Sequence, residues 1–175
     1  MPDLVTIKPI TVTDALLLSE VALKAYCDHY LHLWHDEGQW YINRCFTEPV
    51  LKNELEDPNN LFFLAYLNNE PVGFLKLRLN APFESAPEKN AMELERIYLN
   101  KAVTGKGLGR KLVELSVAIA RENQKELLWL KAMDSSTGPI AFYQQMGFEL
   151  CGTYHLDFTQ MKETLRGMVI MKKEL

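Results

Sequence analysis

The chain has 175 residues, of which 47% are hydrophobic and 24% are charged, a composition that is typical of a soluble globular protein and excludes a fibrous or disordered one. Nineteen Lys and Arg against 23 Asp and Glu give a net charge of −4, which argues against a protein that mainly coats nucleic acid or an anionic membrane. We therefore expect a single domain over residues 1–175 with a small-molecule partner.

The cysteines and the start of the chain indicate a reducing compartment. Cys27, Cys45 and Cys151 are far apart and odd in number, so neither a disulfide framework nor a zinc site is expected. The first residues lack a basic region followed by an apolar stretch, and no apolar run approaches the ~18 residues of a membrane helix. A cytoplasmic protein that is neither exported nor membrane-spanning is the expectation.

The first predicted element is a short strand over residues 4–8. Thr11 or Thr13 can cap the helix that follows, whose apolar residues have helical spacing and which we expect to continue towards Leu31. The chain should then form two short helices, broken near Gly38 and Pro49.

The segment from Tyr26 to Asp57 is both acidic and aromatic, with seven acidic residues, two basic ones and six aromatic rings. Its histidines, His29, His32 and His35, recur every third residue and raise the question of a metal site. A histidine-bearing helix end at the surface is the commoner structure, so no metal is expected.

The middle of the chain predicts strands. Residues 61–67 and 71–79 are apolar runs separated by Asn68-Asn69-Glu70, which tolerate positive φ and predict a β-hairpin. Residues 81–90 predict a loop and residues 92–99 a further strand.

Helix and strand then alternate. We expect a helix over residues 108–123, a buried strand over 127–132, a helix over 139–146, and closing strands near 148–158 and 166–172.

Three alternate glycines, Gly105, Gly107 and Gly109, lie between the strand that ends near residue 99 and the following helix. They let the backbone turn tightly and approach a ligand, and the N–H groups at the start of a helix favour an anion. Four basic side chains surround the turn: Lys101, Lys106, Arg110 and Lys111. The pattern predicts a phosphate-binding turn that is neither a P-loop nor a dinucleotide fingerprint. The alternative is a strand-to-helix turn with solvated lysines.

A second run, from Ser135 to Glu149, contains a predicted helix that ends in Tyr143, Gly147 and Phe148. Alone, such a helix is more often core than catalytic. Together with the glycine turn it resembles the motifs of the GNAT superfamily of N-acetyltransferases, and the order of elements matches that family over essentially the whole chain. Within the family, residues 94–98 and 141–148 resemble the PaiA-type spermidine/spermine N-acetyltransferases of bacteria.

The resemblance implies an α/β (α+β) architecture, the GNAT fold. Its sheet is mixed, mostly antiparallel and twisted, is flanked by helices, and is splayed between the fourth and fifth strands to admit acetyl-CoA. The pyrophosphate would bind the amides of residues 104–109, and the pantetheine would run beside the backbone of residues 97–99. The implied cofactor residues are Ile97, Tyr98, Leu99, Thr104, Gly105, Lys106, Gly107, Leu108, Gly109, Arg110, Ser136 and Tyr143.

Two of these positions depart from the family pattern. Thr104 stands where the family has Gln or Arg, and Ser136 stands where an Asn commonly contacts the cofactor. Because backbone amides make most of a phosphate site, the first departure affects affinity at most, and Ser136 can still donate one hydrogen bond.

Acetyl transfer to an amine of pKa ~10 needs a base, because such an amine is protonated at neutral pH. Glu93 and Glu95 lie two apart on the fourth strand, on one face unless a bulge intervenes, and either could take the proton directly or through water. By family position Glu95 aligns better, and a structural carboxylate paired with Arg or Lys is the alternative for both. Tyr143 falls where the family has the general acid that protonates the leaving thiolate.

The leading function is acetylation of a primary amine, with a polyamine as the first candidate, since the acidic and aromatic segment lines the acceptor cleft in the GNAT fold. The alternatives are a peptide or protein N-acetyltransferase and a non-catalytic acyl-CoA sensor. The expected partners are acetyl-CoA and a small amine, without nucleic acid or membrane, and the sequence is compatible with a homodimer.

Overall fold

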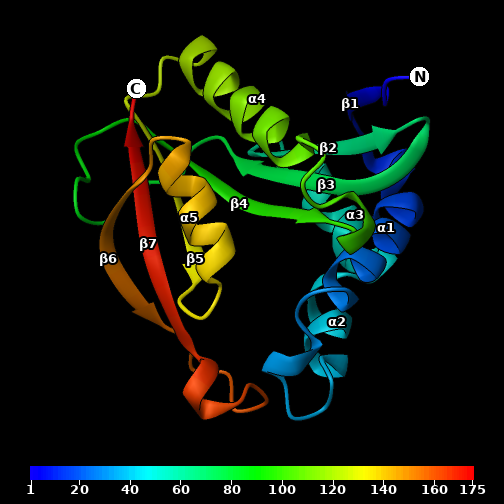
Figure 1. The fold of residues 1–175 in the computed structure, drawn as a ribbon. Coiled ribbons are helices and arrows are strands. Elements are labelled where there is room, and N and C mark those ends of the chain that lie inside the picture. Colours follow the sequence, from blue (N-terminus) through cyan, green and yellow to red (C-terminus); the bar gives the residue numbers. More distant parts are fainter.

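Seven strands form one sheet in the order β1-β2-β3-β4-β5-β7-β6 (Figure 1). The computed structural model describes residues 1–175. The strands are β1 (Val5–Pro9), β2 (Asn60–Leu67), β3 (Glu70–Arg78), β4 (Ala91–Leu99), β5 (Leu127–Met133), β6 (Glu149–His155) and β7 (Gly167–Glu174). All neighbouring strands are antiparallel except β4 and β5, which are parallel, so the predicted mixed, mostly antiparallel sheet is confirmed.

Helices cover both faces of the sheet (Figure 1). They are α1 (Ala15–Cys27), α2 (Gln39–Cys45), α3 (Glu48–Glu56), α4 (Leu108–Glu122) and α5 (Thr137–Gln145). Side chains of α4 and α5 pack in a hydrophobic cluster on one face, and those of α1, α2 and α3 pack in a second cluster on the other. No helix is both long enough and apolar enough to cross a membrane.

Local sequence accounts for several of these boundaries. Asn68 and Asn69 both have positive φ, 51° and 70°, so the predicted β2–β3 hairpin forms with a two-residue turn. Gly38, with φ of 86°, precedes α2, and Pro49 occupies the first turn of α3.

The first helix is shorter than expected, because α1 ends at Cys27 and does not continue towards Leu31. The two residues that follow are held by the end of β4. The Asp28 carboxylate accepts the Lys101 backbone N–H at 2.9 Å, and Nε2 of His29 lies 2.8 Å from the Leu99 carbonyl oxygen. These tertiary contacts turn the chain away from the helix axis.

The sheet is splayed where β4 meets β5, as predicted. The two strands pair only from Ala91 opposite Leu127 to Glu93 opposite Trp129, although β4 continues to Leu99 and β5 to Met133. Beyond Glu93, the edge of β4 that faces β5 has no strand partner. A cleft opens there between the two halves of the sheet.

Candidate active site

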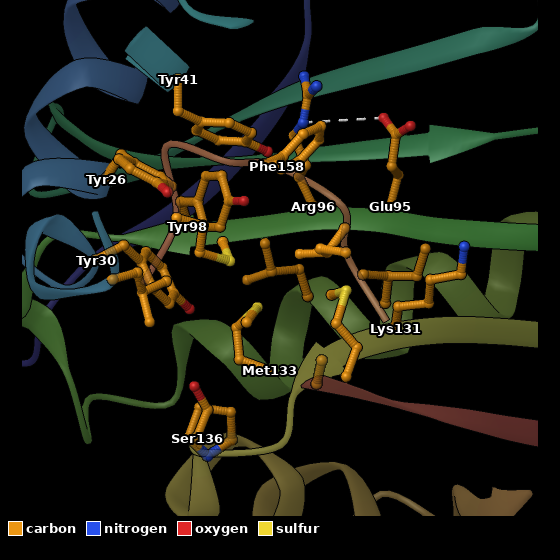
Figure 2. A pocket seen from close by; sticks show the side chains of 18 of the residues that line it. Tyr26, Tyr30, Tyr41, Glu95, Arg96, Tyr98, Lys131, Met133, Ser136 and Phe158 are labelled. Carbon is orange, nitrogen blue, oxygen red and sulfur yellow. Dashed lines mark ion pairs between the residues drawn. The ribbon is translucent and has the colours of Figure 1, made fainter. Parts of the chain in front are cut away.

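A cavity of about 300 Å³ occupies the cleft between β4 and β5 (Figure 2). It brings together six of the residues singled out by the sequence: Glu93, Glu95, Ile97, Tyr98, Ser136 and Tyr143. Leu99, the last residue of β4, and the turn at residues 104–110 that follows it do not line this cavity. The predicted site residues therefore fall into two groups, one that lines the cavity and one at the turn, where Gly109 lies near Leu99 at the end of β4 and Phe142 of α5.

The glycine turn is shaped to bind an anion. Gly105 and Gly107 have φ of 82° and 81°, and a Cβ at either position would meet nothing within 4 Å. The backbone N–H groups of residue 105 and residues 107–110 make no hydrogen bond within the protein. Because they stand at the N-terminal end of α4, these free amides can hold a phosphate or pyrophosphate group.

The two glutamates of β4 are both paired with cations. Glu93 accepts a hydrogen bond from Arg78 at 3.0 Å. Glu95 contacts the Lys76 ammonium, and its carboxylate lies 3.9 Å from Nε of Arg96 (Figure 2). A β-bulge at Glu95 interrupts the register between β3 and β4. Because one extra residue is inserted there, Glu95 and Arg96 can both reach partners on the face that carries α3.

A glutamate from α3 completes this network. One oxygen of Glu54 lies 3.2 Å from the Lys76 ammonium and 3.0 Å from the Arg96 guanidinium. The side chains of Lys76 and Arg96 are only 5% and 10% exposed. Since a buried charge is costly without a partner, the two cations and two carboxylates hold one another in place.

The surroundings move the pKa values of the two β4 glutamates in opposite directions. Burial raises the pKa of Glu93, and the nearby Glu95 charge raises it further, against the opposing effect of Arg78. Burial also acts to raise the pKa of Glu95, but Arg96 and Lys76 outweigh it and lower that pKa overall. Glu93 is therefore the better proton acceptor of the pair near neutral pH.

Tyr143 and Ser136 reach the cavity from α5 and its start. Burial raises the pKa of Tyr143 above its ordinary value, with a smaller contribution from Tyr30, so the phenol stays protonated at neutral pH. Its hydroxyl has no hydrogen-bond partner in the protein and is free to donate to a ligand. Ser136 precedes α5, and its hydroxyl makes no capping bond.

Aromatic side chains form the wall of the cavity opposite α5 (Figure 2). They are Tyr26, Tyr30, Trp34, Tyr41 and Tyr98. Trp34 Nε1 donates to the Tyr26 hydroxyl at 2.8 Å, which fixes these two rings relative to each other. The expectation that the segment from Tyr26 to Asp57 lines the cleft is thus correct for four of its six aromatic residues, because Trp40 and Phe46 are not part of the lining.

The acidic residues of that segment lie elsewhere, and none of the seven lines the cavity. Asp28 and Asp36 accept backbone N–H groups, and Glu54 belongs to the ion network. The charged residues in the lining are Glu93, Glu95, Arg96 and Lys131, so their formal charges cancel. The acidic half of the segment therefore does not line the cleft as expected, and three of its carboxylates, Asp28, Asp36 and Glu54, are instead used in backbone hydrogen bonds and an ion network.

Two groups of residues at the cavity escaped the sequence analysis. The first is the ion network of Arg96, which lines the cavity, with Lys76 and Glu54. The only signal for Lys76 and Arg96 is that a charge interrupts the apolar run of β3 or β4, and Glu54 of α3 was noted only as one of the seven acidic residues. The second comes from the connection between β6 and β7, which contributes Leu156, Phe158 and Met161 to the lining. Nothing in the local sequence of this connection marks it as part of the site.

The three histidines of the N-terminal segment do not converge. No group of three His, Cys, Asp or Glu side chains is arranged to hold a metal ion. His29 instead contacts the end of β4, as described above.

Comparisons with known proteins agree with this geometry. Residues 20–148 match the model of the acetyltransferase (GNAT) family. An uncharacterized N-acetyltransferase of Lactobacillus delbrueckii subsp. lactis is 30% identical over 107 residues, which are 61% of this chain and 62% of that protein. A spermidine N(1)-acetyltransferase of Thermoplasma acidophilum is 25% identical over 165 residues, 91% of this chain and 97% of that protein.

A solved structure has the same fold. The crystal structure of PaiA N-acetyltransferase from Thermoplasma acidophilum, in complex with coenzyme A, superimposes with a TM-score of 0.76 at 22% identity and covers 98% of this chain and 99% of that one.

Proposed function

The chain belongs to the acetyltransferase (GNAT) family, and on this premise we propose that it transfers the acetyl group of acetyl-CoA to the primary amino group of a small amine. The observation that carries the proposal is the split between β4 and β5. The cavity in this cleft is lined by a pair of carboxylates and a half-buried tyrosine, and free amides suited to a pyrophosphate lie at the turn that follows β4.

For the cofactor, we propose that the pyrophosphate binds the amides of residues 104–109 and that the pantetheine runs between the parted strands, beside residues 97–99. The amides of residues 105 and 107–109 have no internal partner and support the first part, because an anion would satisfy them, whereas the amides of Thr104 and Lys106 already donate to backbone carbonyl oxygens. The unpaired edge of β4 beyond Glu93 supports the second. In this arrangement the Thr104 side chain contributes little to cofactor binding, and Ser136 contributes one hydrogen bond from its hydroxyl.

For the chemistry, the amine nitrogen attacks the thioester carbonyl carbon, a C–N bond forms, and the C–S bond breaks. We assign the proton of the amine to Glu93, directly or through water, because its raised pKa makes it a better base than Glu95. Glu95 is held between Lys76 and Arg96 and acts as their structural counter-ion. Tyr143 donates its hydroxyl proton to the departing thiolate, which leaves as the CoA thiol, and the tyrosinate is reprotonated by the second proton that the nitrogen loses on becoming the amide.

A polyamine is the first candidate acceptor. The spermidine acetyltransferase of Thermoplasma acidophilum, at 25% identity, supports this choice, as does the aromatic wall, because the faces of Tyr and Trp rings attract ammonium groups. The acidic side chains outside the cavity add long-range attraction for a cation.

The test is thiol release from acetyl-CoA with spermidine, a neutral aryl amine and a peptide amine, each at two salt concentrations. We expect the largest kcat/KM for spermidine and a fall in its lead as salt rises, because exposed charges are screened. A lead for the peptide that salt does not alter would favour a peptide acetyltransferase. CoA binding without turnover of any amine would favour an acyl-CoA sensor.

A further inference from the structure

The two halves of the split sheet are joined a second time, at the open end of the cleft. The connection between β6 and β7 crosses there and meets the turn after α1 (Figure 1). Trp34 and Met161 form an isolated antiparallel bridge, with hydrogen bonds from His35 N–H to Gln160 O at 3.0 Å and from Lys162 N–H to Leu33 O at 2.8 Å. We call residues 156–166, together with residues 33–35, the clasp.

Side chains reinforce the backbone pairing in the clasp. Trp34 and Met161 are each only 2% exposed. The Phe158 ring packs against Trp40 with ring centres 5.1 Å apart and against Trp34 at 6.1 Å. On its outer side, the Arg44 guanidinium lies over the Phe158 ring at 5.5 Å. The β6–β7 connection is thereby fixed to α2 and the turn before it.

The β6–β7 connection is also braced internally. The Arg166 guanidinium donates to the Met161 carbonyl oxygen at 2.9 and 3.1 Å, and the Leu156 N–H donates to the Arg166 carbonyl oxygen at 2.9 Å. A loop held by several hydrogen bonds is not expected to open freely, because opening would break these hydrogen bonds together.

The clasp therefore bounds the cavity. Leu156, Phe158 and Met161 line it from one half of the molecule, and Leu33 and Trp34 line it from the other. A volume of about 300 Å³ is at the small end for a ligand pocket, and the thiol arm of the cofactor must share it. Little room is left for the acceptor.

We infer that the clasp restricts the acceptor to slender, unbranched alkyl amines and excludes amines on ring-rich molecules and folded chains, with Phe158 as the residue that sets the limit. This inference rests on the proposed function. Phe158 is suited to the role because its ring lines the cavity, while the backbone hydrogen bonds beside Trp34 and Met161 hold the clasp without that ring.

The experiment compares spermidine, as the slender amine, with kanamycin, as the ring-rich amine. Thiol release gives kcat/KM for wild type, Phe158→Ala and the milder Phe158→Leu. Leu150→Ala, which removes an exposed apolar side chain of β6 outside the cavity, is the matched control. We expect Phe158→Ala to raise the kanamycin-to-spermidine ratio of kcat/KM by about tenfold or more, Phe158→Leu to raise it less, and Leu150→Ala to leave it unchanged.

Acceptor binding is measured in parallel through tryptophan fluorescence, with CoA present, because Trp34 lines the cavity. If wild type binds spermidine selectively and Phe158→Ala loses this selectivity, the inference about the clasp is supported even when no amine is acetylated. The lack of acetylation would then overturn only the proposed function. Equal handling of both amines by wild type overturns the inference. An unchanged ratio in both Phe158 variants, each folded and binding CoA normally, overturns it as well.

Discussion

Replacement of Gly107 by alanine tests the proposed phosphate-binding turn. The residue has φ of 81° and no heavy atom within 4 Å of an added Cβ, so Gly107→Ala causes strain but no collision. A non-glycine residue in this left-handed conformation costs roughly 1–2 kcal/mol. We expect the turn to relieve this strain by rotating its amides away from the anion, so that the affinity for CoA falls and the free energy of unfolding falls by at most that amount.

The loss of affinity follows from the free N–H groups at residue 105 and residues 107–110. A hydrogen bond to a charged group contributes about 1.5–3 kcal/mol, so the loss of one amide contact weakens CoA binding by about 10- to 150-fold. Titration calorimetry with CoA measures the affinity, and urea unfolding measures the stability. Gly38→Ala is the control, because Gly38 has φ of 86° but lies before α2 and outside the turn. A folded Gly107→Ala protein that binds CoA as tightly as wild type would refute the proposed binding site.

Four further substitutions test the chemistry of the site and the packing of β3 against β4. Tyr143→Phe should lower kcat by roughly 10²-fold or more without changing CoA affinity, and an unchanged rate with chemistry limiting would remove Tyr143 from the mechanism. Arg78→Met removes a cation that lowers the pKa of Glu93, so the acidic limb of the pH profile of kcat/KM should move to higher pH. Glu93→Gln should abolish that limb. An acidic limb that stays in place in both variants contradicts the assignment of Glu93 as the base. Gly73→Ala would bring a Cβ onto the Tyr98 carbonyl oxygen and should lower the free energy of unfolding by about 1–3 kcal/mol or more in urea, and wild-type stability would show that β3 can move away from β4.

The parts of the structure that the sequence predicted are those with local causes. The hairpin at Asn68 and Asn69 and the glycine turn before α4 each depend on the conformations that a few adjacent residues can adopt. The splay between β4 and β5 was expected only through the family resemblance, because no local pattern indicates where two strands stop pairing.

The parts that escaped prediction depend on residues far apart in the chain. Glu54 and Arg96 are 42 positions apart, yet they pair, and the Arg96 charge that this pairing holds beside Glu95 is the main cause that lowers the pKa of Glu95 against the effect of burial. The clasp likewise joins residues near Trp34 to residues near Met161, and either segment alone has the composition of an ordinary loop.

The glycine turn has a consequence for how this protein can change over evolutionary time. Its binding groups belong to the main chain, which every residue type supplies, and only Gly105 and Gly107 adopt backbone angles that narrow the choice of residue. Thr104, whose φ and ψ of −60° and 135° suit any side chain, can be exchanged without removing a donor. Binding of a ligand through the main chain requires that the backbone conformation of the turn be conserved, while most of the surrounding residues can change during evolution.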